Sequence, residues 1–368
     1  MPNLLITGGA GFIGANFVRY WNEKYPNDSL VILDALTYSG NMANLSGLTD
    51  FSFFRGDIRD TSLVERLLHD HEVDTIVHFA AESHVDRSIN GPDAFIETNL
   101  SGTHSLLKAA KSVWLDKGSG KPHRFHHIST DEVYGSLGPN DPPFSETTAY
   151  APNSPYSASK AGSDHIVRAY HHTFGLQTTT TNCSNNYGPY QFPEKLIPLF
   201  IINCLTGKDL PIYGDGMNVR DWLHVEDHCR GIDLVLEKGR IGETYNVGGG
   251  AELPNVAVID AICAGVDAAF EHDSQLGRRF PDAPAARGKK SEFLKTHIAD
   301  RLGHDRRYAI DERKIREELG YEPVRTFEQG FQETLGWYLA NEDWWRATMD
   351  GSYLKWMASN YSERARRT

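Results

Sequence analysis

The sequence predicts an α/β protein: a doubly wound, Rossmann-type parallel sheet with a smaller, mixed α/β C-terminal lobe. Short apolar runs alternate with helical patterns through the first half of the chain, which is typical of parallel strands covered by helices on both faces. The glycine-rich stretch "TGGAGFIG" joins the first apolar run to the first helical pattern. A dinucleotide-binding fold has its phosphate turn at that place.

Each expected strand is a short apolar or β-branched run. These runs lie at residues 3–7, 29–35, 51–57, 73–81, 124–130 and 176–184. Helical patterns lie between them, at residues 11–25, 60–71, 93–114 and 154–174. The last of these patterns is followed by Gly175, a typical helix end. The order of these runs predicts the parallel sheet.

The alternation ends after Gly188, where a second lobe is expected to begin. Short, turn-rich stretches follow at residues 210–216, 219–227 and 243–250, and helical patterns lie near 254–270, 311–319 and 326–341. The polar stretch 274–297 is expected to be a surface loop. We expect a Rossmann domain at residues 1–187, to which 222–250 returns, and a second lobe at 188–368 that is mainly substrate-binding.

Composition argues against several classes of protein. A formal net charge of −12 repels nucleic acid. No apolar run approaches about 18 residues, and the start "MPNLLITGG" lacks a basic region. The four cysteines contain no CxxC pair. We therefore expect a cytoplasmic protein without a metal site, a membrane partner or a nucleic-acid partner.

The glycine-rich stretch predicts a dinucleotide site. Gly8, Gly11 and Gly14 allow a tight turn and close approach to a pyrophosphate at a helix N-terminus. Asp34 ends the second run, about 20 residues beyond the last glycine, where a carboxylate binds ribose hydroxyls. Ala35 follows without an adjacent arginine for a 2′-phosphate, so NAD is favoured over NADP. Asp57 ends the third run in the same way and is expected near the adenine.

A second motif, "YSASK", predicts redox chemistry. Tyr156 and Lys160 lie one helical turn apart and share a face. A nearby ammonium is expected to lower the pKa of the phenol, which could then take a proton from a sugar hydroxyl. Thr130, at the end of the fifth run, supplies a neighbouring hydroxyl. Asp131 and Glu132 follow it directly, and both can serve one site only if the strand ends at Thr130.

These motifs resemble the extended short-chain dehydrogenase/reductase family. The stretches "TYSGN", "AAESHVDRSI", "STDEVYG", "NNYGPYQFPEKLIPL" and "GHDRRYAID" are similar to the dTDP-glucose 4,6-dehydratases within it. The resemblance implies oxidation of a nucleotide sugar at C4, elimination of water across C5 and C6, and return of the hydride to C6. It implies Asp131 as the acid and Glu132 as the base of the elimination.

The same resemblance implies further contacts and a homodimer built from helices at 98–114 and 156–172. Leu302 departs from the family pattern, in which a proline is expected. Trp344 and Trp345 are expected to pack the C-terminal helix. The cofactor contacts implied are Phe12, Ile13, Ala35, Leu36, Thr37, Ile58, Ala80, Ala81, Thr98 and Asn186. The substrate contacts implied are Ser83, Thr130, Asn185, Lys195, Leu196, Pro211, Tyr213, Arg220, Asn255 and His304.

Three other functions stay open at this point. One is a 4,6-dehydratase that acts on UDP- or CDP-glucose, because the base pocket uses scattered contacts. Another is a nucleotide-sugar 4-epimerase or decarboxylase, although such relatives lack the adjacent Asp131 and Glu132. The third is a non-catalytic NAD-binding protein, and the presence of Tyr156 and Lys160 argues against it.

Overall fold

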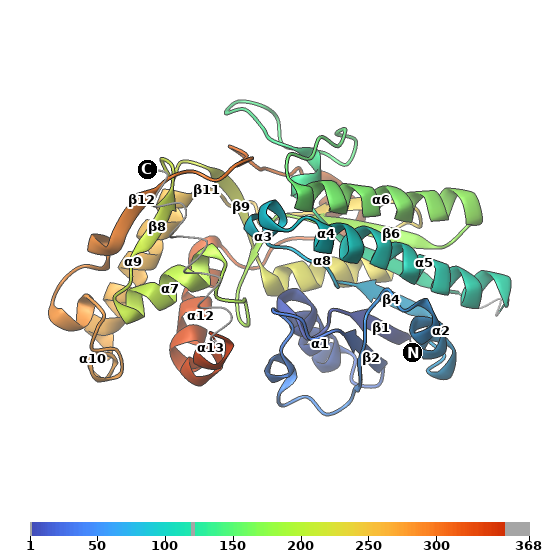
Figure 1. The fold of residues 1–368 in the computed structure, drawn as a ribbon, viewed down its shortest axis with the longest axis horizontal. Coiled ribbons are helices and arrows are strands. Elements are labelled where there is room, and N and C mark those ends of the chain that lie inside the picture. Colours follow the sequence, from blue (N-terminus) through green and yellow to red (C-terminus); the bar gives the residue numbers. More distant parts are fainter. Residues whose placement is uncertain (1, 119–121, 350–368) are drawn as a thin grey trace.

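A seven-stranded parallel sheet forms the centre of the larger lobe in the computed structural model, which describes residues 2–118 and 122–349 (Figure 1). The strand order is β3-β2-β1-β4-β5-β6-β10, and every neighbouring pair is parallel. The strands are β1 (Asn3–Thr7), β2 (Ser29–Asp34), β3 (Ser52–Arg55), β4 (Thr75–His78), β5 (Arg124–Thr130), β6 (Thr178–Cys183) and β10 (Thr244–Val247). The predicted Rossmann-type sheet is confirmed.

Helices cover both faces of this sheet because successive strand side chains point to opposite sides. Leu5 packs into a core with α2 (Thr61–Asp70), α5 (Thr103–Lys111) and α6 (Pro155–Phe174). Its neighbours Leu4 and Ile6 pack into another core. That core includes residues of α1 (Phe12–Lys24) and α8 (Val225–Lys238).

Local sequence signals set the bounds of α6, which carries the YSASK motif. Ser154 caps its first turn and exchanges hydrogen bonds with Ser157 in a capping box, with Pro155 as the first helical residue. The helix ends at Gly175, whose φ is 76°, a conformation that glycine adopts without strain. This end was predicted.

One continuous helical stretch corresponds to the pattern at residues 93–114. It comprises α4 (Asp93–Phe95), a π-helical segment at Ile96–Gly102, α5, and a second π-helical segment at Ser112–Asp116. The π segments were not foreseen.

The smaller lobe has two small sheets and its own core (Figure 1). One sheet has the order β11-β9-β7 and the other pairs β12 with β8. These strands are β7 (Asn185–Tyr187), β8 (Leu210–Tyr213), β9 (Val219–His224), β11 (Glu252–Pro254) and β12 (Lys295–Ile298). The remaining helices are α3 (Val85–Asn90), α7 (Leu196–Thr206), α9 (Asn255–His272), α10 (Leu276–Arg279), α11 (Arg313–Leu319), α12 (Phe327–Ala340) and α13 (Glu342–Thr348).

Several parts of the chain differ from the sequence-based expectation. Helices α3, α7 and α8 were not predicted; α7 is buried along nearly its whole length and so lacks an amphipathic period. The stretch 274–297 is not simply a surface loop, because it contains α10, two 3₁₀ turns and the start of β12. Its Phe280 is buried and stacks on Trp345. Residues 350–368, at the end of the expected second lobe, lie outside the described residues.

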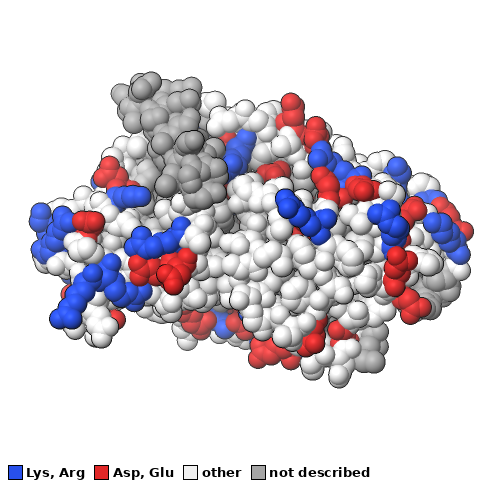
Figure 2. Space-filling view, turned by 60° about the horizontal axis from the view of Figure 1, so that its bottom comes forward, with Lys and Arg blue, Asp and Glu red and all other residues white. Residues whose placement is uncertain are grey.

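Two properties of the surface and helices bear on possible partners. On the face shown in Figure 2, acidic and basic side chains are interspersed around a largely uncharged centre. Within residues 2–118 and 122–349, no helix is both long enough and apolar enough to cross a membrane.

Candidate active site

The carboxyl ends of the parallel strands border a cavity of about 530 Å³, the usual ligand position in this architecture. It is lined by nearly all residues predicted to bind the cofactor. These are Gly8, Gly11, Phe12, Ile13, Gly14, Asp34, Ala35, Thr37, Asp57, Ile58, Ala80, Ala81, Thr98, Tyr156, Lys160 and Asn186. Leu36 is the exception among the predicted set: it does not belong to the lining.

The turn between β1 and α1 leaves room for a pyrophosphate because its glycines have no side chains. Gly8 has a φ of 71°, and a Cβ there would lie 2.6 Å from the Ala80 backbone nitrogen. A Cβ on Gly14 would lie 2.2 Å from the Gly8 carbonyl oxygen. The N-cap residue of α1, Gly11, provides no side-chain cap, so the first N–H groups of the helix are left for an anion. This turn fits the diphosphate of NAD.

Asp34 supports this turn as well as lining the cavity. Its Oδ2 accepts a hydrogen bond from the Ala10 N–H (2.9 Å), and its Oδ1 accepts one from the Leu36 N–H (2.8 Å). Burial raises the pKa of the carboxyl. Leu36 therefore contributes a backbone contact to Asp34 rather than a wall of the cavity.

Arg59, next to the predicted Asp57, was not foreseen as part of this site. Its guanidinium donates to Asp57 Oδ2 from Nε (3.0 Å) and Nη2 (2.8 Å), and it also pairs with Glu97. These bonds hold the pKa of Asp57 below its usual value. Arg59 and Glu97 both line the cavity, so an arginine is present after the third strand, although none adjoins Ala35.

Tyr156 and Lys160 lie in the first turns of α6 and are both buried. The Lys160 Nζ donates to the Ile128 carbonyl oxygen of β5 at 2.7 Å. The expected lowering of the Tyr156 pKa is not what the structure shows. Burial first, and then the negative charge of Glu132, raise it, while a hydrogen bond with Thr130 acts in the opposite direction.

Strand β5 ends at Thr130, and a 3₁₀ turn over Asp131–Tyr134 begins directly after it. The Glu132 N–H donates to Thr130 Oγ1 at 3.3 Å. Because the strand ends there, Asp131 and Glu132 do not alternate across the sheet, and both line the cavity. This is the condition under which one site can use both carboxyl groups.

The two carboxyl groups have different surroundings. Asp131 is 1% exposed, and its Oδ2 has no hydrogen-bond partner in the described part of the chain. Its pKa is raised well above the usual value by burial and then by the charge of Glu132. Glu132 is half-buried, and burial also raises its pKa, but the positive charges of Arg301, Arg220 and Lys195 oppose the shift.

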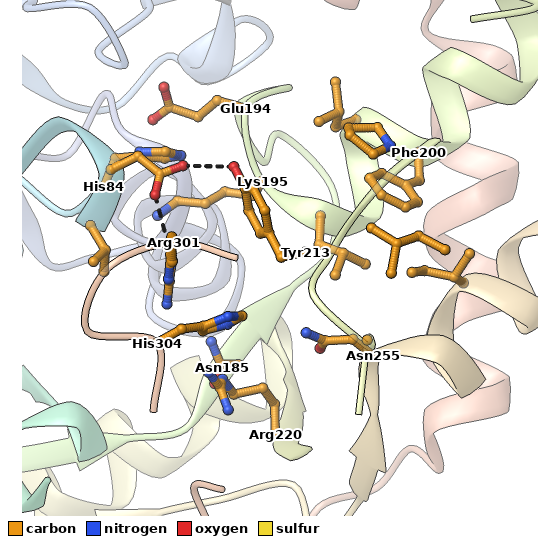
Figure 3. Close-up of a pocket in the computed structure, with 18 of the residues that line it drawn as sticks. His84, Asn185, Glu194, Lys195, Phe200, Tyr213, Arg220, Asn255, Arg301 and His304 are labelled. Atoms are coloured by element: carbon orange, nitrogen blue, oxygen red, sulfur yellow. Dashed lines mark hydrogen bonds and ion pairs between the residues drawn. The ribbon is translucent and has the colours of Figure 1, made fainter. Parts of the chain in front are cut away.

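Figure 3 shows the residues of a second cavity, of about 160 Å³, which shares part of its lining with the first. Glu132, Asn185, Lys195 and Leu196 line both cavities. The second cavity brings together most of the predicted substrate contacts: Asn185, Lys195, Leu196, Pro211, Tyr213, Arg220, Asn255 and His304. The other two, Ser83 and Thr130, line the first cavity.

Both cationic and anionic side chains line this second cavity, with Lys195, Arg220 and Arg301 as the cations. The buried Arg220 donates from Nη2 to the Asp305 carbonyl oxygen (2.9 Å) and lies over the Tyr308 ring. Lys195 Nζ donates to the Ser83 carbonyl oxygen at 3.1 Å. Burial, followed by the charges of Arg301 and Arg220, lowers the pKa of His304 to about 4. Arg220 and Lys195 suit a diphosphate in a protein that is otherwise acidic.

Sequence reasoning missed several residues of the second cavity. Arg301 lines it, and its Nε is buried without a hydrogen-bond partner in residues 2–118 and 122–349. Asp86 accepts a hydrogen bond from the Tyr213 hydroxyl (3.0 Å) and lies 4.0 Å from Arg301 Nη1 (Figure 3). The other lining residues not foreseen are His84, Val85, Glu194, Leu199, Phe200, Ile212, Gly216, Trp222 and Ile259. Three of the missed residues lie in charged stretches of the sequence that could have indicated them: His84 and Asp86 in "ESHVDRSI", and Arg301 in "DRLGH".

Comparison with known proteins gives consistent matches. Residues 5–334 match the model of the GDP-mannose 4,6 dehydratase family. The chain is 55% identical over 358 residues to the dTDP-glucose 4,6-dehydratase of Xanthomonas campestris pv. campestris (strain B100), covering 96% of this chain and 97% of that one. It is 50% identical over 374 residues to the dTDP-glucose 4,6-dehydratase of Salmonella typhimurium, covering 98% and 99%.

A solved structure agrees with these matches. DesIV of Streptomyces venezuelae, a dTDP-glucose 4,6-dehydratase crystallised with NAD, superposes with a TM-score of 0.82 at 47% identity. The superposition covers 94% of this chain and 99% of DesIV.

Proposed function

This chain belongs to the nucleotide-sugar 4,6-dehydratase family, among the dTDP-glucose 4,6-dehydratases, and on that premise we propose how its residues share the reaction. It is an NAD-dependent hydro-lyase that converts dTDP-glucose into dTDP-4-dehydro-6-deoxyglucose and water. The observation that carries the proposal is the position of Glu132. It lies where the cofactor cavity meets the second cavity, directly beside the buried Asp131.

The first step removes the proton of the sugar C4 hydroxyl, and we assign it to Tyr156. Bound NAD would supply the acceptor for the C4 hydride and the source of the hydride for C6. Tyr156 must be ionised to take the proton, although burial raises its pKa. Thr130 offsets part of this shift by a hydrogen bond, and we assign to the ammonium of Lys160, one helical turn away, the role of stabilising the phenolate during the reaction.

The second step eliminates water, and it uses the two carboxyl groups. The C5 proton is acidic because it lies next to the C4 carbonyl, and Glu132 accepts it. The C5–C6 double bond forms as the C6–oxygen bond breaks, and Asp131 gives its proton to the departing hydroxide.

The last step restores the protein groups. As hydride returns to C6, Glu132 gives its proton back to C5, and the C4 carbonyl remains in the product. The proton kept by Tyr156 balances the one that Asp131 gave up, so proton exchange between these two groups or with solvent resets the site.

The electrostatics of the two carboxyl groups support this division of roles. A general acid must hold its proton near neutral pH, and the burial of Asp131 raises its pKa. A general base must be ionised, and Arg301, Arg220 and Lys195 stabilise the ionised form of Glu132. The same cations are our proposed partners of the dTDP diphosphate.

Three wider assignments complete the proposal. We assign NAD binding to residues 1–187 together with 222–250, since β10 and α8 pack onto the main sheet, and sugar-nucleotide binding mainly to 188–368. A cytoplasmic location agrees with free thiols at all four cysteines, which lie in the described part of the chain. A homodimer through α5 and α6 agrees with the position of these two adjacent helices on the outer face of the sheet.

The test separates the two chemical steps. Tyr156→Phe is expected to abolish C4 oxidation, so no bound NADH forms. Glu132→Gln leaves Tyr156 and Lys160 in place, so bound NADH is expected to accumulate while turnover falls about 10²- to 10⁴-fold. Rapid-mixing absorbance at the NADH band, with deuterium exchange at C5, measures both effects.

A matched control is Glu146→Gln, because Glu146 is also half-buried and has a pKa raised by burial, yet it lines neither cavity. This variant is expected to turn over at close to the wild-type rate. If Glu132→Gln exchanges the C5 hydrogen at the wild-type rate, the role assigned to Glu132 is wrong.

A further inference from the structure

Ala10 is the residue of the glycine-rich turn with the most backbone hydrogen bonds to other segments of this lobe. Its N–H donates to Asp34 Oδ2 (2.9 Å). Its carbonyl oxygen accepts from the Asn41 N–H (3.0 Å) and from Asn44 Nδ2 (2.8 Å). The Asn44 side chain therefore provides one of the three hydrogen bonds that hold the turn between Gly8 and Gly11.

A residue from the far end of the chain sets the direction in which the Asn44 side chain points. The Trp344 Nε1–H of α13 donates to Asn44 Oδ1 at 2.8 Å, and Asn44 is 1% exposed. An indole N–H is only a donor, whereas the two ends of an amide differ, one accepting and the other donating. With Trp344 on its oxygen, Asn44 must turn its NH₂ group toward Ala10.

Other contacts hold Trp344 and Asn44 in place. The Trp344 ring meets the Trp337 ring of α12 edge-on, with centroids 5.0 Å apart, and the Tyr190 ring at 5.8 Å. The guanidinium of Arg19, on α1, lies over the Tyr190 ring, 4.8 Å from its centroid. Arg19 also donates from Nε to the Asn44 carbonyl oxygen (3.0 Å). These contacts link Trp344 of α13 to Arg19 of α1 through Asn44 and Tyr190.

We propose that Trp344 is a positioning residue for NAD: its indole N–H orients Asn44, which holds the Ala10 carbonyl and so the phosphate turn in its binding shape. Trp344 does not belong to the lining of the cofactor cavity as the described residues form it; it acts through Asn44. The inference rests on NAD binding and is independent of the roles proposed for Asp131, Glu132 and Tyr156. Either can fail without the other.

The experiment is a calorimetric titration of NAD into the full-length protein freed of nucleotide. Trp344→Phe keeps the ring and removes the donor. It is expected to raise the Kd for NAD about 3- to 10-fold, the range of one hydrogen bond. The KM for dTDP-glucose at saturating NAD should stay within about twofold of the wild-type value.

The matched control is Trp114→Phe. Trp114 is buried and, like Trp344, donates a hydrogen bond from Nε1, here to the Val73 backbone carbonyl at 2.9 Å, but it lines neither cavity. Its Kd for NAD should match the wild-type value even if its Tm falls. An unchanged Kd in Trp344→Phe, or an equal rise in both variants, would overturn the proposal.

A double-mutant cycle tests the route through Asn44. Asn44→Ala should weaken NAD binding by itself, which also provides a test if Trp344→Phe fails to fold. Adding Trp344→Phe to Asn44→Ala should cause no further rise in the Kd. Fully additive losses would show that Trp344 acts by another route, and would also count against the proposal.

Discussion

Asp131 and Glu132 are adjacent in the sequence, yet their surroundings suit them to opposite proton transfers. Asp131 is buried with one oxygen unpartnered in the described part of the chain, so its neutral form is favoured. Glu132 is half-buried and lies near three cations. The 3₁₀ turn that begins after Thr130 brings both groups to one cavity. The separation of roles is therefore a consequence of burial and neighbouring charge.

The burial of Asp131 predicts a specific dependence of stability on pH. Its pKa is higher in the folded protein than in the unfolded chain, where it is about 3.9. Its contribution to stability is therefore complete below the unfolded pKa and is lost as the pH rises toward the folded pKa. Asparagine cannot ionise, so Asp131→Asn should raise Tm relative to wild type, and by more at pH 8 than at pH 5.

Differential scanning calorimetry at both pH values measures this effect. Asp215→Asn is the control, since the hydrogen bond with Arg306 lowers the pKa of Asp215 to about 2 and keeps it ionised throughout this range. Its Tm difference from wild type should be the same at both values. A Tm difference for Asp131→Asn that does not grow with pH would contradict the assignment of Asp131 as a group held neutral by its site.

At the scale of elements, the turn from β1 to α1 joins cofactor binding to backbone conformation. Gly8→Ala should weaken NAD binding about 10-fold or more. The added Cβ would lie 2.6 Å from the Ala80 nitrogen at a φ of 71°, so the turn must move. Isothermal titration with NAD measures the loss.

Gly175→Ala is the matched control for that substitution. Gly175 has a similar φ of 76°, but a Cβ there meets nothing within 4 Å. It should lose about 1 kcal/mol of stability from backbone strain alone and bind NAD with unchanged affinity. Equal affinities for Gly8→Ala and wild type would show that the turn does not shape the cofactor site.

At the scale of the whole molecule, the proposed homodimer makes a prediction about α6. Ala169 is exposed on this helix. In a four-helix bundle of α5 and α6 with their copies, the longer charged side chain of Ala169→Arg would be desolvated. Light scattering on this variant, as it elutes from a size-exclusion column, should then give the mass of one chain, near 41.2 kDa, instead of about twice that value.

Ala264→Arg is the control for this experiment, because Ala264 is also exposed but lies on α9 in the other lobe. It should remain dimeric. A wild-type mass near that of one chain, or a dimeric Ala169→Arg, would rule out this interface.

Local patterns determined the parts of the protein that depend on residues close together in the chain. The parallel sheet follows from alternating runs, the phosphate turn from Gly8, Gly11 and Gly14, and the end of α6 from Gly175. The positions of Tyr156 and Lys160 on one helix face follow from their spacing. Each of these features is set by backbone geometry or periodicity, which a sequence displays directly.

The tertiary structure decided what depends on contacts between distant residues. Helix α7 is buried on all sides by other segments, so no period marked it. The pKa of Tyr156 is raised by burial and by Glu132, whereas the sequence indicated only the neighbouring Lys160, which was expected to lower it. Arg301 reaches the second cavity, and Trp344 reaches Asn44 across 300 residues. Burial, charge proximity and long-range hydrogen bonds exist only once the chain has folded, and they complete the site.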